Sequence, residues 1–149
     1  MRAVVQRVCQ ASVTVEGAVS GQIQKGMLIY LGVTHDDDAS DIHWLADKIV
    51  NLRMFPDADA KMNLSITDVS GEILLISQFT LYGDCRKGRR PGFDQSADPD
   101  LAERLCEEII EAICDRQIPV QTGRFGAHME VRSTNDGPVT FLLDSKKLF

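Results

Sequence analysis

The sequence predicts a single α/β domain, residues 1–149, in which a mixed, mostly antiparallel sheet packs with two main helices. Three observations support this. The chain has 149 residues, 44% of them hydrophobic, which is enough for one core and too little for two. Strand-like segments outnumber helical ones, and only two stretches carry an apolar stripe at helical spacing. No repeat, linker or low-complexity stretch divides the chain.

The N-terminal part is expected to form three strands. Residues 3–8 are mostly apolar, and residues 12–16 alternate cleanly between apolar and polar side chains. Gly17 and Gly21 then indicate a turn region. Residues 27–33 form a continuous apolar run that is short enough to be a fully buried strand.

The first helix is predicted from its N-terminal signals and its apolar stripe. Residues 35–40 supply N-cap side chains and negative charge for the positive end of the helix. Apolar residues then recur at spacings of three, four and three: Ile42, Leu45, Ile49 and Leu52. Pro56 closes the segment.

A buried strand, a long loop and a second helix are expected next. Residues 57–70 are polar and turn-rich, and residues 72–81 form another apolar strand. Residues 83–98 form a loop rich in glycine, proline and charge, and long loops in compact domains are often functional. The second helix begins near residues 96–98, with Pro99 at its first position. Its apolar residues recur every four positions: Leu101, Leu105, Ile109 and Ile113.

The remaining chain is strand-like, at residues 120–121, 127–132 and 139–143. Because strands that neighbour one another along the chain usually pair as hairpins, the sheet should be mixed and mostly antiparallel.

Charge and cysteine content exclude several classes of protein. A net charge of −6 and a pI near 5.0 argue against broad, non-specific binding to nucleic acid. No C-x-x-C pair or histidine spacing indicates a metal site, and no cofactor is expected. The cysteines other than Cys85 (Cys9, Cys106 and Cys114) are expected to be reduced, buried thiols.

The N-terminus and the hydropathy pattern indicate a cytoplasmic protein. No apolar run approaches the ~20 residues that span a bilayer, so no membrane association is expected. The opening residues 1–15 have a strand-like alternation and lack the apolar core of a signal peptide.

One local cluster runs against the acidic composition. Residues 86–90 hold four of the sixteen basic side chains: Arg86, Lys87, Arg89 and Arg90. The cluster lies in the long loop directly after the predicted strand at residues 72–81. Loops at strand ends are common ligand sites, and arginines bind phosphate in a bidentate manner, so the cluster is a candidate anion site.

No standard catalytic constellation is present, whether a G-x-S-x-G elbow, a Walker A loop or an H-E-x-x-H pair. Ser77 and Cys85 are candidate nucleophiles. The cations that follow Cys85 would favour its thiolate, but no base is evident near either residue. His43 is expected at the surface and His128 in a structural role.

Two segments resemble the signature motifs of the D-aminoacyl-tRNA deacylase family. Residues 77–84 read SQFTLYGD, and residues 135–140 read NDGPVT. Similarity to the family continues in residues 4–13, 87–93 and 123–129. Because two motifs occur at the family's separation in a chain of its length, the sequence is identified as a member from residue 1 to about 143.

The resemblance implies hydrolysis of the ester that joins a D-amino acid to the 3′-terminal adenosine of a tRNA. Such an enzyme proofreads aminoacyl-tRNA and serves translation quality control. The resemblance also implies a β-barrel-like sheet and a homodimer with two active sites at its interface. The acceptor end of the aminoacyl-tRNA is expected to bind the basic cluster at residues 86–90.

The first motif implies the catalytic residues Ser77, Gln78, Phe79 and Thr80. Backbone N–H groups near Phe79 and Thr80 would stabilise the oxyanion. Either Thr80 is a nucleophile or the terminal 2′-OH of the tRNA assists water, and the lack of a base near Thr80 in the sequence favours the second. Ser77 and Phe79 also separate this chain from a sister family that carries Pro and Ala there.

The second motif implies a chiral filter. A cis Gly137-Pro138 peptide is expected to reach the partner's pocket, accept the substrate's α-amino group and exclude L-side chains. Arg7 would brace this peptide, and Phe125 and Met129 would line the pocket. Because glycine has no side chain to exclude, glycyl-tRNA mischarged on alanine tRNA should also be accepted.

Two other functions remain open at this point. A non-catalytic module that binds RNA ends would use the same basic loop. A small-molecule hydrolase would use Cys85 as its nucleophile.

Overall fold

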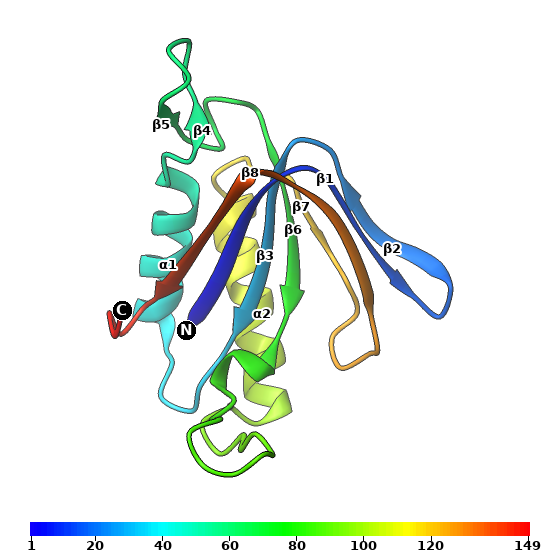
Figure 1. The fold of residues 1–149 in the computed structure, drawn as a ribbon. Coiled ribbons are helices and arrows are strands. Elements are labelled where there is room, and N and C mark those ends of the chain that lie inside the picture. The colour runs from blue at the N-terminus through cyan, green and yellow to red at the C-terminus, as the bar shows by residue number, and fades with distance from the viewer.

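The computed structural model describes residues 1–149 and shows a curved, mixed sheet flanked by two helices (Figure 1). The helices are α1 (Ala39–Asn51), α2 (Pro99–Cys114) and the short 3₁₀ helix η1 (Phe79–Tyr82). The main sheet contains β1 (Arg2–Val15), β2 (Ala18–Ile23), β3 (Gly26–Gly32), β6 (Glu72–Ser77), β7 (Val120–Thr122) and β8 (Glu130–Asp144). A separate two-stranded sheet pairs β4 (Phe55–Pro56) with β5 (Met62–Leu64).

The order of the main sheet is β2-β1-β3-β6-β7, and β8 pairs with β1. The three partners of β1 run antiparallel to it, whereas β3-β6 and β6-β7 are parallel. The prediction of a mixed, mostly antiparallel sheet in one α/β domain is therefore confirmed.

The two ends of the strand order lie close together, which makes the sheet barrel-like. The Ser20 hydroxyl on β2 donates to the Thr122 carbonyl on β7 at 3.3 Å. A side chain at Gly21 would lie 2.7 Å from the same carbonyl oxygen, so only glycine permits this close approach. The sheet is thus nearly closed at β2 and β7, and the barrel-like expectation is confirmed.

Two cores explain the unbroken apolar run of β3. Met27, Ile29 and Leu31 belong to a 22-residue cluster with the helices, whereas Leu28 belongs to a seven-residue cluster of sheet residues from β1, β2, β3 and β6. Alternate side chains of a strand point to opposite faces, so a strand between two cores is apolar throughout.

Both helices begin as predicted. Asp38 caps α1 in a capping box, because it accepts from the Ser40 N–H at 2.8 Å while Asp41 accepts from the Asp38 N–H at 3.0 Å. Asp98 precedes α2, and Pro99 occupies its first turn. Leu52, predicted as the last apolar residue of the first helix, lies just outside it, since α1 ends at Asn51.

Several strand predictions were wrong in their bounds. The segments 127–132 and 139–143, predicted as separate strands, belong to the continuous strand β8, which begins at Glu130. Residues 17–21, expected as a turn region, belong largely to β2, which pairs with the continuous strand that joins 3–8 to 12–16. Part of the turn-rich segment 57–70 forms β5. The alternation of apolar and polar residues and the positions of glycine indicate only the local preference of the backbone. Whether a strand forms depends on pairing with a neighbouring strand.

The strand predicted at residues 72–81 is shorter. β6 ends at Ser77, and η1 follows at Phe79–Tyr82. The last bond to β3 runs from the Gln78 N–H to the Leu31 carbonyl at 2.7 Å, and β3 itself ends one residue later. Without a neighbouring strand, the chain turns instead of remaining extended.

Cysteine burial follows the prediction only at Cys106, which is buried; Cys9 and Cys114 are exposed. Cys9 lies where the β1-β8 register shifts, and Cys114 is the last residue of α2. His43 is exposed, as predicted. None of the helices has the length and apolar character needed to cross a membrane.

Candidate functional site

A cavity of about 470 Å³ opens where β6 ends. Its walls come from the end of β6, the first half of α2 and the segment between β7 and β8. Five residues named from the sequence line it: Ser77, Gln78, Phe79, Phe125 and Met129. The start of the first motif and the distant segment 123–129 thus meet at one site.

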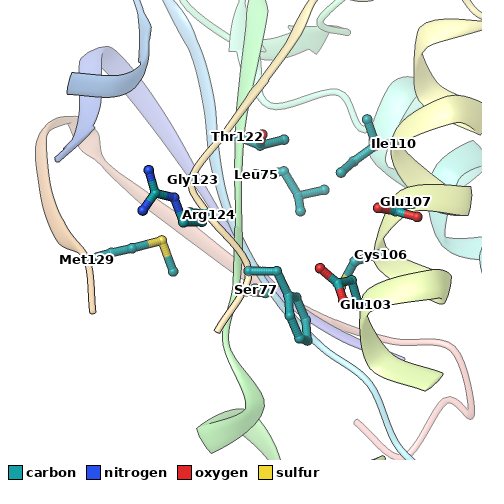
Figure 2. Close-up of a pocket in the computed structure, with 11 residues that line it drawn as sticks. Leu75, Ser77, Glu103, Cys106, Glu107, Ile110, Thr122, Gly123, Arg124 and Met129 are labelled. Carbon is teal, nitrogen blue, oxygen red and sulfur yellow. The ribbon is translucent and has the colours of Figure 1, made fainter. Parts of the chain in front are cut away.

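A second cavity of about 290 Å³ adjoins the first and shares four residues with it: Ser77, Cys106, Phe125 and Met129. Figure 2 shows Ser77 between Met129 on one side and the side chains of Cys106 and Glu103 on α2 on the other. The larger cavity is lined mainly by apolar side chains, whereas the smaller one also carries the carboxylates of Glu103 and Glu107.

Sequence reasoning missed the α2 wall of this site and did not place His128 in it. Pro99, Ala102 and Cys106 line the larger cavity, and their spacing of three and four places them on one helical face. His128, expected in a structural role within a strand, precedes β8 and lines the same cavity. In the sequence, the only signal for this wall is the spacing of Pro99, Ala102 and Cys106, which lie beside the main apolar stripe of α2.

The backbone after β6 presents free donors. Phe79 and Thr80 open η1, and the N–H groups that open a helix have no acceptor inside it. The Ser96 hydroxyl donates to the Phe79 carbonyl at 3.0 Å and so helps to hold this turn. The turn therefore offers backbone N–H groups beside the cavity mouth, the arrangement that stabilises an oxyanion.

The Thr80 hydroxyl is not prepared as a nucleophile. Its only hydrogen bond within the chain is with the Gln78 side-chain amide, which donates to Oγ1 at 2.5 Å. No carboxylate or imidazole accepts its proton, and Thr80 does not line the cavity. A hydroxyl without a base is a weak nucleophile.

Gly137 and Pro138 lie exposed on β8, and the peptide bond between them is cis. Gly137 has a φ of +126°, a conformation that favours glycine. A side chain at this position would also come within 3.1 Å of the Arg7 Nη2 atom. Glycine is therefore required here by both backbone angle and space.

Arg7 lies beneath this segment, with 8% of its surface exposed. Its Nη1 donates to the Met54 carbonyl at 2.6 Å, and its Nε lies 3.0 Å from the Asp136 carboxylate. The Nε–H is not aligned with that carboxylate, so the contact is an ion pair without a well-formed hydrogen bond. Arg7 thus links the residue before Gly137 to the segment that follows α1.

Asn135 ties the same segment to β1. Its side-chain amide donates to the Arg7 carbonyl at 2.9 Å and to the Val139 carbonyl at 3.0 Å. The amide thus bridges the two ends of the Gly137-Pro138 stretch, where the regular β1-β8 pairing is interrupted.

Neither Arg7 nor the Gly137-Pro138 pair lines the cavity of its own chain. Arg7 pairs with Met27 on β3, whereas Ser77 pairs with Leu31. Four residues along a strand span about 13 Å, and β1 and β6 lie on opposite sides of β3. One chain by itself does not bring the two motifs together.

The basic cluster lies on a closed hairpin. Asp84 and Gly92 exchange backbone hydrogen bonds of 2.7 and 2.9 Å, which places residues 85–91 at the tip. Arg86 contacts the Asp84 carboxylate through Nε and Nη2, and these bonds lower the pKa of Asp84 to about 2. The other three cations are exposed and form no ion pair: Lys87, Arg89 and Arg90.

The two cysteines near these elements are poorly suited to nucleophilic catalysis. Cys85 lines a separate polar cavity of about 720 Å³ in which no histidine takes part. Cys106 lines the candidate site, but burial, with a smaller effect of Glu103 and Glu107, raises the pKa of its thiol to about 12. A neutral thiol is a weak nucleophile.

Comparisons with known proteins agree on one family. A family model described as D-Tyr-tRNA(Tyr) deacylase matches residues 4–144. Proteins named D-aminoacyl-tRNA deacylase from Clostridioides difficile (strain 630) and Thermosipho africanus (strain TCF52B) are 60% and 58% identical over 149 residues. The alignments cover all of this chain and all of both relatives.

Solved structures show the same fold. The c-Myc DNA Unwinding Element Binding Protein superposes with a TM-score of 0.91 and 38% identity, over 97% of this chain and 98% of its own. A probable eukaryotic D-amino acid tRNA deacylase gives a TM-score of 0.81, over 95% of this chain and 97% of its own. At 17% identity, the second likeness concerns the fold alone.

Proposed function

This chain belongs to the D-Tyr-tRNA(Tyr) deacylase family, and from that premise we propose how its residues carry out the reaction. The protein is a D-aminoacyl-tRNA deacylase, an enzyme that hydrolyses the ester between a D-amino acid and tRNA. One observation carries the assignment of the site. The first family motif begins at the cavity, with Ser77, Gln78 and Phe79 in its wall.

The reaction needs positioning more than a strong nucleophile, because an aminoacyl ester is already reactive. The backbone N–H groups of Phe79 and Thr80 bind the developing oxyanion. The Thr80 hydroxyl accepts from Gln78 and has no base, so the attacking water is assisted by the 2′-OH of the terminal adenosine. Phe125 and Met129 hold the substrate from the opposite wall.

Chiral selection is assigned to the Gly137-Pro138 segment of a second copy of the chain. Its backbone carbonyls receive the α-amino group of a D-substrate and leave no room for an L-side chain. Because backbone groups do the excluding, the filter works for many side chains and does not reject glycine. Glycyl-tRNA mischarged on alanine tRNA is therefore a second substrate.

A homodimer with sites at its interface is supported by two properties of the Gly137-Pro138 segment: its exposure and its distance from Ser77 of the same chain. Gly137 and Pro138 are exposed and lie far along the sheet from Ser77. Arg7 and Asn135 hold the segment in a defined position on the surface. A defined, exposed backbone segment that is remote from its own site is suited to entering the site of a neighbour.

The macromolecular partner is the acceptor end of aminoacyl-tRNA. The free cations Lys87, Arg89 and Arg90 bind its phosphates, while Arg86 is occupied by Asp84. A local patch suffices for this, so the net charge of −6 is compatible with the partner. The substrate is present where translation occurs, which places the enzyme in the cytoplasm.

A deacylation assay with matched D- and L-tyrosyl-tRNA tests the proposal. At enzyme concentrations well below that of the substrate, the D-ester should be lost rapidly and the L-ester only at the enzyme-free rate. Binding without turnover would instead identify a module that binds RNA ends. Equal cleavage of both esters would reject the chiral filter and leave the deacylase activity standing.

A further inference from the structure

Two aromatic rings are exposed together beside the cavity mouth. Phe79 is 57% exposed and Phe93 is 37% exposed. Their ring centroids lie 5.1 Å apart, at an interplanar angle of 63°. Single exposed apolar side chains are common, but a contacting aromatic pair at the edge of an active site indicates a binding surface.

The structure holds Phe93 in a defined position. A side chain at Gly83 would lie 3.1 Å from the edge of the Phe93 ring, so the ring packs directly against this backbone. The Asp84-Gly92 hydrogen bonds fix the residue just before Phe93. Phe93 is therefore an ordered platform on the protein surface.

The same hairpin carries the three free cations Lys87, Arg89 and Arg90 directly before Phe93 in the sequence. Exposed aromatic faces combined with unpaired cations recognise single-stranded nucleic acid, because bases stack on the rings and phosphates bind the cations. An apolar protein partner would have to desolvate these cations without compensation. The combination favours a nucleic-acid strand as the occupant.

We propose that Phe93, supported by Phe79, stacks on the nucleobase that precedes the terminal adenosine of the substrate tRNA. Phe79 lines the cavity, whereas Phe93 does not and contacts Phe79 from outside. A strand whose last nucleotide lies in the cavity passes Phe93 on its way to the cations. The inference rests on the proposed deacylase function and adds to it a subsite for the single-stranded acceptor end.

Two substrates of different length test the subsite in the full-length protein. D-tyrosyl-tRNA contains the preceding base, and 3′-O-(D-tyrosyl)adenosine lacks it. Phe93→Ala should raise KM for the tRNA about tenfold, within the range measured for loss of one stacked base, and leave kcat nearly unchanged. Both constants for the adenosine ester should stay at wild-type values.

Phe93→Trp retains a stacking face and should restore the KM for the tRNA. Val19→Ala is the matched control, since Val19 is 62% exposed on β2 and lines neither cavity of the candidate site. Equal losses on both substrates would show that Phe93 only supports Phe79 and would overturn the subsite. Unchanged KM for the tRNA would overturn it as well. A wild-type protein that cleaves neither ester would instead reject the proposed function.

Discussion

At the scale of single residues, the hydrogen bond between Gln78 and Thr80 bears on whether Thr80 can act as the nucleophile. The threonine hydroxyl accepts from an amide, and nothing in the chain removes its proton. A hydroxyl in this state contributes shape and polarity but no nucleophile.

Replacing Thr80 by valine therefore tests the reaction route. Thr80→Val keeps the shape of the side chain and should lower kcat by about tenfold or less, whereas loss of a covalent nucleophile costs on the order of 10⁶ in a serine hydrolase. A D-tyrosyl-tRNA that ends in 2′-deoxyadenosine should react at least about 100-fold more slowly, as expected on loss of acid–base assistance. Single-turnover rates measure both, and the reverse pattern would assign the attack to Thr80.

Cys106 is a second residue whose surroundings determine its chemistry. Burial raises the pKa of its thiol to about 12, while Cys9, Cys85 and Cys114 are exposed. At pH 8, iodoacetamide should modify the three exposed cysteines and leave Cys106 unmodified. Peptide mass spectrometry reads the sites, and a sample in denaturant, where all four should react, is the control.

The same shift has a consequence for stability. The thiol pKa is higher in the folded chain than the ~8.5 of an unfolded cysteine, so the folded state holds this proton more tightly. The contribution of Cys106 to stability is complete below pH ~8.5 and is lost as the pH rises toward 12. A Cys106→Ala variant should show a smaller decline in urea midpoint over that alkaline range.

At the scale of elements, the starts of the two helices differ in one testable respect. Asp38 accepts backbone and side-chain bonds from Ser40, whereas Asp98 precedes α2 without any side-chain cap bond. Asp38→Ala should lower the urea midpoint of unfolding because a helix cap is lost, whereas Asp98→Ala should lower it much less.

Urea denaturation measures both variants, and deacylation should be unchanged in Asp38→Ala. The hydrogen bonds from Ser40 lower the pKa of Asp38, so the cap is present above about pH 4 and is lost as the pH falls and the carboxylate is protonated. The difference between wild type and Asp38→Ala should therefore shrink in acid. Equal losses in the two aspartate variants would show that the cap bonds contribute nothing.

At the scale of the whole molecule, the two motifs lie too far apart to meet in one chain, and a complementation experiment tests whether they meet between chains. Ala102→Trp fills the cavity, and Gly137→Val displaces the β8 segment through its contacts with Arg7 and Val139. Each variant should be inactive by itself.

Co-refolded at equal concentration, the two variants should recover about a quarter of wild-type activity. Random assortment makes about half of the dimers mixed, and each mixed dimer has one of its two sites built from unaltered parts. If both motifs acted within one chain, every subunit would carry a defect and the mixture would stay inactive. Sedimentation velocity on each variant confirms that the dimers form.

Local signals in the sequence were sufficient for the two main helices and for the approximate positions of β1, β3 and β6. The Asp38 cap and Pro99 lie within one turn of the helix starts that they mark, and apolar spacing reports which face is buried. Similarity to the family, in the first motif and in residues 123–129, pointed to Ser77, Phe79, Phe125 and Met129, and all four line the cavity.

Where β6 ends, and which side chains stand around it, was decided by tertiary structure. The strand ends because its neighbour β3 ends beside it. The α2 wall of the cavity forms because the packing of α2 places Pro99, Ala102 and Cys106 opposite this strand end. Likewise, Arg86 is removed from the basic cluster by an ion pair with Asp84. The sequence by itself determined the family, the elements and the motif residues, because these depend on local chemistry. The separation of Gly137-Pro138 from Ser77 depends on strand register between distant segments, which only the folded chain determines.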